Sequence, residues 1–229
     1  MAKGPYFNRT LFAFLRELAD NNDRAWFQDN KARYVAELRD PALAFIEGFA
    51  PSLYKISDRF LADPRTVGGS LFRIYRDTRF SKDKRPYKTH VGIQFRHEVG
   101  RDAHAPGFYL HLEPGSVWAA AGVWHPERDA LAMIREAIIK DPGGWKRAVG
   151  GKAFRARARL GGESLKRAPR GYDPEHPMIE ELKRKDFVAV SELSERAACK
   201  PDFATEVAAS FRAFGPLMRY LCKALGVSY

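Results

Sequence analysis

Cysteine is almost absent from this chain, which has only Cys199 and Cys222 among its 229 residues. The two lie far apart and form no CxxC pair, so neither a disulfide-rich scaffold nor a thiolate zinc site is indicated. We expect both to be ordinary reduced thiols, because cysteine is commonly buried as a small apolar side chain.

Long apolar runs are missing as well. No segment approaches the roughly 20 apolar residues that a membrane-spanning helix requires. The first residues, Met-Ala-Lys-Gly-Pro-Tyr-Phe-Asn, have neither the apolar core nor the cleavage pattern of a signal peptide. We therefore expect no membrane association and a cytoplasmic location. With 45% hydrophobic and 13% aromatic residues, the chain still has enough apolar material for one sizeable core.

Acidic residues are outnumbered by basic ones. The chain has 39 Lys and Arg against 28 Asp and Glu, which gives a formal net charge of +11 at pH 7. Such a field attracts phosphorylated metabolites and nucleic acids. The expected partner is therefore an anionic small molecule or a polyanion, with nucleic acid as one candidate.

Hydrophobic periodicity indicates one α+β domain over residues 1–229. Apolar residues recur at helical spacing over about 8–60, alternate with period 2 over about 70–124, and return to helical spacing within a basic part over about 126–229. We find no internal repeat and no clear linker. The pattern predicts an antiparallel sheet with N-terminal and C-terminal helices packed on one face.

Several residues are typical of helix starts. Asn8 or Thr10 precedes the first helical pattern, and Asn21-Asn22-Asp23 precedes the second. Asp40-Pro41 predicts the start of a third helix, because proline suits the first helical position. A last long helix is expected over residues 202–225.

Strands are predicted over residues 71–76, 90–96, 107–113 and 116–123, with another near 187–191. The two-residue connection Pro114-Gly115 has the length of a tight hairpin turn. That turn fixes the cross-strand register. The predicted partners are Glu113 with Ser116, His111 with Trp118, Tyr109 with Ala120, and Leu112 with Val117 on the buried side.

The alternation leaves one polar and aromatic face on the predicted sheet. Its members are Arg73, Tyr75, His90, Gln94, Arg96, Tyr109, His111, Glu113 and Trp118. A face of this kind can simply be solvated, but aromatic rings such as Tyr109 and Trp118 need a cover or a ligand. A functional groove and a face covered by a helix or loop are both open at this point.

The densest cluster of cations lies in residues 73–90, called the basic loop below. Seven Lys and Arg residues accompany two acids, Asp77 and Asp83, with aromatic residues between them. Because Arg and Lys donate well to phosphate and carboxylate, the loop predicts a site for an anionic ligand. The predicted ligand contacts are Arg73, Tyr75, Arg76, Asp77, Arg79, Asp83, Lys84, Tyr87, Lys88, His90, Tyr109 and Trp118. Alternatively, the two aspartates pair with neighbouring arginines and make the loop a rigid structural element.

Histidines near the same face raise two further hypotheses. His111-x-Glu113 could ligate a metal with His90, but no HExxH or cluster of Asp accompanies it, so we predict neither a metal nor a cofactor. A carboxylate near a histidine suits acid–base chemistry, which makes His111 and Glu113 candidate catalytic residues. No known nucleophile or nucleotide-binding motif is present, and whether the protein is an enzyme stays open. His97 and His104, in a predicted loop, are expected at the surface.

A second basic stretch covers residues 146–170, where nine Lys and Arg residues accompany one acid, Glu163. Residues 154–160 alternate and predict an edge strand with Arg155, Arg157 and Arg159 in solvent. The alternative is non-specific contact with a nucleic-acid backbone.

The pattern Arg73-x-x-Arg76-Asp77-x-Arg79-Phe80-x-x-Asp83-Lys84-x-x-Tyr87 resembles the signature of a widespread uncharacterised family, domain of unknown function 2461. The resemblance extends to Asn21-Asn22-x-x-x-Trp26-Phe27, the segment 107–115, Arg167-Ala-Pro-Arg-Gly-Tyr-Asp173 and His176-Pro177. It covers nearly the whole chain and implies a single domain of about this length. It implies no activity, substrate or cofactor, so it assigns no catalytic residue.

Overall fold

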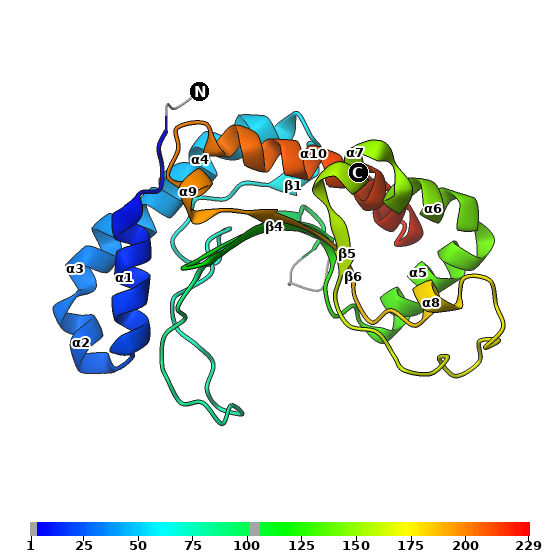
Figure 1. The fold of residues 1–229 in the computed structure, drawn as a ribbon, viewed down its shortest axis with the longest axis horizontal. Helices are drawn as coiled ribbons and strands as arrows, with labels where there is room; N and C mark the ends of the chain where they lie inside the picture. Colours follow the sequence, from blue (N-terminus) through cyan, green and yellow to red (C-terminus); the bar gives the residue numbers. More distant parts are fainter. Residues whose placement is uncertain (1–3, 101–105) are drawn as a thin grey trace.

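Antiparallel pairing joins every strand found in the described residues, 4–100 and 106–229. Within these residues the computed structural model has one six-stranded sheet in the order β1-β2-β3-β4-β6-β5 (Figure 1). The strands are β1 (Phe60–Leu61), β2 (Val91–His97), β3 (Gly107–Glu113), β4 (Ser116–Val123), β5 (Arg159–Gly161) and β6 (Phe187–Leu193). The predicted α+β class and antiparallel sheet are confirmed.

The N-terminal helices follow one another closely, and the first two begin where the capping pattern predicts. They are α1 (Arg9–Asp20), α2 (Arg24–Asp29), α3 (Lys31–Arg33), the π-helical turn η1 (Tyr34–Arg39) and α4 (Asp40–Tyr54). The Asn8 side chain accepts hydrogen bonds from the backbone N–H groups of Thr10 and Leu11, and Asp23 accepts one from Trp26. These bonds satisfy amides that the first helical turn leaves without a partner.

Helix α4 begins at Asp40-Pro41 as predicted, but no break in the chain separates it from the preceding turn η1. Pro41 lacks an N–H group, and its ring clashes with the carbonyl four residues earlier in a regular helix. The preceding turn is widened instead, and the Asp40 N–H donates to the carbonyl of Val35, five residues back. A π-helical turn therefore accommodates the proline without ending the helix.

The remaining helices belong to the C-terminal half. They are α5 (Arg128–Lys140), α6 (Pro142–Gly150), α7 (Lys152–Arg157), α8 (Ile179–Leu182), α9 (Glu195–Ala198) and α10 (Phe203–Ala224). The long helix α10 runs across the sheet beside α4 (Figure 1). None of the helices in the described part of the chain is long and apolar enough to cross a membrane.

Aromatic contacts place helices α4 and α10 on one face of the sheet. Phe108 of β3 stacks on Phe211 of α10 with ring centroids 4.6 Å apart, and Phe95 of β2 lies 5.3 Å from Phe49 of α4. All four side chains are fully buried. Burial of each such ring contributes roughly 1.5–3 kcal/mol, so this face of the sheet is the centre of the core.

The register of the β3–β4 hairpin agrees with the sequence. Glu113 pairs with Ser116 and His111 with Trp118. The other two predicted pairs, Leu112 with Val117 and Tyr109 with Ala120, are also present. The turn residue Gly115 has φ 75°, a left-handed conformation that glycine adopts without strain. Since cross-strand partners point to the same side, the hairpin separates a core face from a polar face.

The strand predicted over residues 71–76 does not form. Leu71 makes one isolated bridge to β2, and the chain then folds back so that the Arg76 N–H donates to the Pro86 carbonyl at 2.8 Å. Pro86 has no N–H to donate in return, so a regular ladder cannot continue there.

The edge strand predicted over residues 154–160 is also shorter than expected. Helix α7 takes the first part, and only β5 pairs with β6 at the edge of the sheet. Phe154 is buried while Arg155 and Arg157 are exposed, an arrangement that a helical turn provides as well as a strand. The four residues 154–157 are too few to distinguish the period of a helix from that of a strand.

His97 is buried, which corrects the surface location predicted for it. Strand β2 extends through this residue and turns its side chain to the core face, where it is 1% exposed. Its Nε2 lies 2.7 Å from the carbonyl oxygen of Ser228, and the ring meets Phe60 edge-on at 5.1 Å. The expectation for His104 lies outside the described residues.

Candidate functional site

The basic loop lies below the sheet, on the side of helices α1–α3 (Figure 1). It doubles back on itself, since the Lys88 N–H donates to the Ile74 carbonyl at 2.8 Å and Tyr75 forms a bridge with Tyr87. The loop thereby brings its two ends beside strands β2 and β3.

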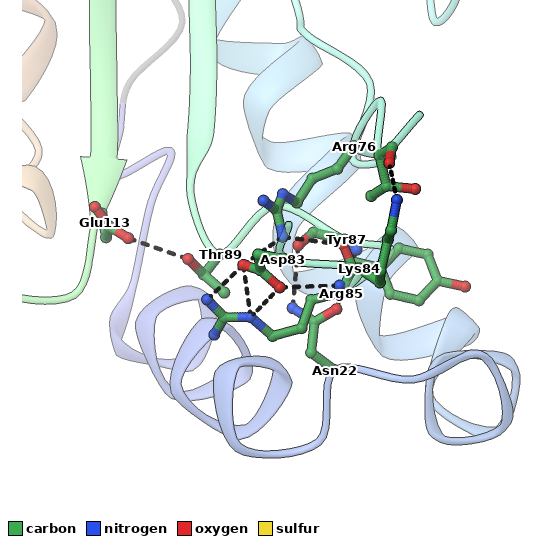
Figure 2. A network of polar contacts seen from close by, with 9 residues as sticks. Asn22, Arg76, Asp83, Lys84, Arg85, Tyr87, Thr89 and Glu113 are labelled. Atoms are coloured by element: carbon green, nitrogen blue, oxygen red, sulfur yellow. Dashed lines mark hydrogen bonds and ion pairs between the residues drawn. The ribbon is translucent and has the colours of Figure 1, made fainter. Parts of the chain in front are cut away.

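Asp83 holds two arginines of the loop (Figure 2). Its carboxylate accepts from Arg76 Nη1 at 2.8 Å and from Arg85 Nη2 at 2.8 Å, and the Arg85 backbone N–H also donates to it at 3.0 Å. Hydrogen bonds from Arg85, and then from Arg76, hold the pKa of Asp83 well below its usual range. Asp83 is therefore an anionic anchor inside the loop.

Asp77 pairs with Arg79 in the same way. Arg79 Nη2 lies 2.7 Å from the carboxylate, and the Arg79 backbone N–H donates at 3.2 Å. These bonds lower the pKa of Asp77 to about 2. Arg76, Arg79 and Arg85 are thus engaged within the loop, as the structural alternative requires.

The other cations of the loop have no carboxylate partner among the described residues. Lys84 donates to the Thr78 carbonyl at 2.9 Å, and Lys88 donates to the Arg73 carbonyl at 2.9 Å. Within the same part of the chain, the side chains of Arg73 and Lys82 make no hydrogen bond or ion pair. The motif therefore contains two groups of cations: arginines paired with aspartates, and cations whose N–H groups can still donate to a ligand.

The two tyrosines of the motif differ in their exposure to solvent. Tyr87 is 3% exposed and stacks on Phe27 with centroids 4.1 Å apart, so its ring belongs to the core. Tyr75 is 50% exposed and lies 5.5 Å from Tyr87. Tyr75 is the ring that a ligand can reach.

The polar face of the sheet carries a stack of three rings from β3, β4 and the end of the basic loop. His111 lies between His90, at 4.5 Å, and Trp118, at 4.6 Å and an interplanar angle of 10°. Helices α4 and α10 cover the opposite face, so the stack points away from the core (Figure 1). The pairing of His111 with Trp118, together with the position of His90 just before β2, thus brings the three rings together, as the sequence predicts.

His111 also lies in a chain of hydrogen bonds along β3. Its Nε2 is 3.2 Å from Glu113 Oε2, and its Nδ1 is 3.1 Å from the Tyr109 hydroxyl. Because a carboxylate only accepts, neutral His111 carries its proton on Nε2, and Nδ1 accepts from Tyr109. The arrangement places an imidazole between a hydroxyl donor and an orienting carboxylate, a combination of groups that acid–base chemistry uses.

The surroundings keep His90, Tyr109 and His111 uncharged. Burial lowers the pKa of His111, although Glu113 opposes this, and it raises the pKa of Tyr109. Burial and the neighbouring His111 lower the pKa of His90 to about 4. At neutral pH the ring stack is therefore neutral.

Thr89, near the end of the basic loop, and Phe72, just before the loop, connect it to this face, and the sequence analysis did not identify them. The Thr89 hydroxyl donates to Glu113 Oε1 at 3.1 Å (Figure 2). The Phe72 ring lies 5.9 Å from Tyr109, and the Lys88 ammonium lies 5.3 Å above that ring. Both residues flank the predicted motif, so the only available signal was their position next to it.

Few side chains of this site could act together as metal ligands. Across residues 4–100 and 106–229, no three His, Cys, Asp or Glu side chains lie together as potential metal ligands. His90, His111 and Glu113 are accounted for by the stacking and hydrogen bonds described above.

Comparison with known proteins gives a family but no activity. A family model described as a conserved hypothetical protein matches residues 10–220. No curated protein and no solved structure matches the chain. The chemistry of the site must therefore be inferred from its own residues.

Proposed function

The chain belongs to the DUF2461 family of conserved hypothetical proteins, and from its geometry we propose that it binds a small anionic, phosphate-bearing ligand. The proposed site is the part of the polar face where the basic loop meets β2 and β3. Lys88 and Arg73 supply charge there, His90 supplies a ring surface beside them, and Trp118 supplies another at the β4 end of the ring stack.

Lys88 is the observation that carries this proposal. Its side chain is half-buried, and within the described residues its ammonium faces a carbonyl and a ring but no carboxylate. Burial, and then the charge of Arg73, lower the pKa of Lys88. An anion placed beside it would satisfy the remaining donors of the ammonium and offset that unfavourable environment.

The paired arginines support the site indirectly. Arg76 and Arg85 fix Asp83, and that network holds the loop in one conformation (Figure 2). A rigid loop holds Lys88 and Arg73 in place before the ligand arrives, which reduces the entropy lost on binding. The structural and the binding roles of the motif thus act together.

Titration with inorganic phosphate and tripolyphosphate, followed by calorimetry and by NMR of the loop amides, tests the proposal. Lys88→Met should weaken binding roughly tenfold or more, the usual loss for a charged hydrogen bond. Arg73→Gln should have a similar but smaller effect. Lys82→Gln is the matched control, because it removes one exposed charge from the same loop. Equal affinity in Lys88→Met and Lys82→Gln would overturn the proposal.

The hydrogen-bond chain of β3 favours a second function, proton transfer on the bound ligand. Tyr109, His111 and Glu113 already form a donor, a base and an orienting carboxylate. In an enzyme, His111→Gln and Glu113→Gln would abolish turnover while ligand affinity stayed within a few-fold. Loss of affinity and turnover in parallel would instead indicate that these residues only shape the site.

Nucleic acid is the competing partner, since the net charge of the chain attracts any polyanion. An affinity for DNA or RNA that falls steeply with salt, and that Lys88→Met leaves unchanged, would favour it over a small ligand. A cytoplasmic location, where phosphorylated metabolites are found, is part of the same proposal. Fractionation of cells that express the chain tests it.

A further inference from the structure

The ring stack on the polar face has one open end. His111 covers one face of Trp118 at an interplanar angle of 10°. A pocket of about 480 Å³ also borders Trp118. Its volume falls within the range of small-molecule sites, roughly 300–1,000 Å³.

Strand register places this pocket on the side of Trp118 that is away from His111. Trp118 pairs with His111 of β3 on one side and with Glu192 of β6 on the other. Beyond β6, Arg159 of β5 pairs with Val190, and both residues line the pocket together with Glu192. Since adjacent strands lie about 4.8 Å apart, the pocket continues the line of the stack by one position.

An ion pair also lines the pocket. Arg159 Nη2 lies 2.5 Å from Glu192 Oε1, and both side chains are more than half exposed. A guanidinium stacks on aromatic rings, and the carboxylate accepts hydrogen bonds at a ring edge. The floor is the apolar Val190 side chain. The pocket is thus lined by an indole and by a guanidinium, the two kinds of flat group on which a ligand ring can stack.

We infer that this pocket, called the base slot below, binds the heteroaromatic base of a nucleoside polyphosphate, as the fourth ring of the stack. The inference rests on the proposed function, whose anion site it extends. His90 lies beyond His111 in the stack, and Lys88 precedes His90 by two residues in the chain. A phosphate chain, rather than one phosphate, is needed to span the stack and meet Lys88.

Calorimetric titration with adenosine, AMP, ATP and tripolyphosphate tests the two ends of the ligand separately. ATP should bind more tightly than AMP and more tightly than tripolyphosphate. Trp118→Leu should weaken ATP binding about fivefold or more, from the usual contribution of a base stacked on an aromatic ring. Trp118→Phe should restore most of the loss, and Arg159→Gln should cause a smaller one.

Trp124→Leu is the control, because it removes another half-exposed tryptophan just beyond the far end of β4. Thermal unfolding of each variant shows whether it is folded. Equal affinity for ATP and tripolyphosphate, unchanged in Trp118→Leu, would overturn the base slot and leave the anion site standing. Binding of adenosine through Trp118, with ATP affinity unchanged in Lys88→Met, would support the slot and reject the anion site. No binding of any of the four would reject both.

Discussion

Asn22 and Tyr87 exchange two hydrogen bonds across 65 residues of sequence. The Asn22 side-chain Nδ2 donates to the Tyr87 carbonyl at 3.0 Å, and the Tyr87 N–H donates to Asn22 Oδ1 at 3.0 Å. The amide thus imitates a strand partner for the backbone of the basic loop (Figure 2). Phe27, which stacks on Tyr87, closes the same junction. Two separate segments of the family motif are therefore one structural unit.

The first prediction concerns this junction. Asn22→Ala removes both partners of the part-buried Tyr87 backbone, so the free energy of unfolding should fall by about 2 kcal/mol. Asn21→Ala is the matched control, because its exposed side chain only bonds the Glu17 carbonyl at the end of α1. Urea unfolding followed by circular dichroism measures both. A loss in Asn22→Ala no larger than that of the control would contradict the junction.

The sheet was predictable because its determinants are local. Alternation over β3 and β4, together with the Pro114-Gly115 turn, sets the register, and with it the meeting of His111 and Trp118. The helix caps Asn8 and Asp23 were predictable for the same reason, since each acts on amides two or three residues away. Interactions between residues close together in the sequence can therefore be predicted from the sequence pattern.

The loop pairings could not be decided from the sequence because they depend on how the chain folds back. The Asp77–Arg79 contact is local, but Arg76 reaches Asp83 only because the loop doubles back. A loop with its arginines pointing outward was equally consistent with the same amino-acid sequence. The pocket beside Trp118 could not be predicted from the sequence for a similar reason. It needs Arg159, which arrives on the sheet through the pairing of β5 with β6.

The second prediction concerns the acid titration of the loop. The pKa of Asp77 is about 2 in the fold, below its ordinary 3.8, so the stabilisation from its ion pair is present above about pH 4 and is lost as the pH falls through about 2. NMR of the carboxyl carbon should give that midpoint. Arg79→Gln should return the midpoint toward 3.8 and leave Asp83 unchanged, because Asp83 is held by other arginines. A midpoint near 3.8 in the unaltered protein would show that the pair does not persist in solution.

The third prediction concerns His90. Its pKa of about 4 lies below the ordinary 6.5 because the ring is partly buried beside His111. The neutral ring therefore stabilises the fold fully above about pH 6.5, and this contribution is lost as the pH falls through about 4. The free energy of unfolding should decline over that interval, and His90→Gln should flatten part of the decline. His176→Gln, outside the stack, should keep the full decline. Ring titration by NMR with a midpoint near 6.5 for His90 would refute the argument.

The fourth prediction concerns the attachment of α10 to the sheet. Ser191 of β6 and Ser210 of α10 are 4% and 0% exposed, and their hydroxyl oxygens lie 3.0 Å apart. Ser210→Ala leaves the Ser191 hydroxyl buried without this partner and should lower the free energy of unfolding by about 1–2 kcal/mol. Ser191→Ala should have a similar effect.

The double variant of Ser191 and Ser210 gives the decisive comparison. Once both hydroxyls are gone, no polar group is left unsatisfied, so the double loss should be smaller than the sum of the single losses by about 1 kcal/mol. Strict additivity in urea unfolding would mean that the two hydroxyls do not depend on each other. A coupling of the expected size would show that the buried bond fixes α10 over β6. That anchor also matters for the site, because Glu192, the cross-strand partner of Trp118, projects from the other face of the same strand.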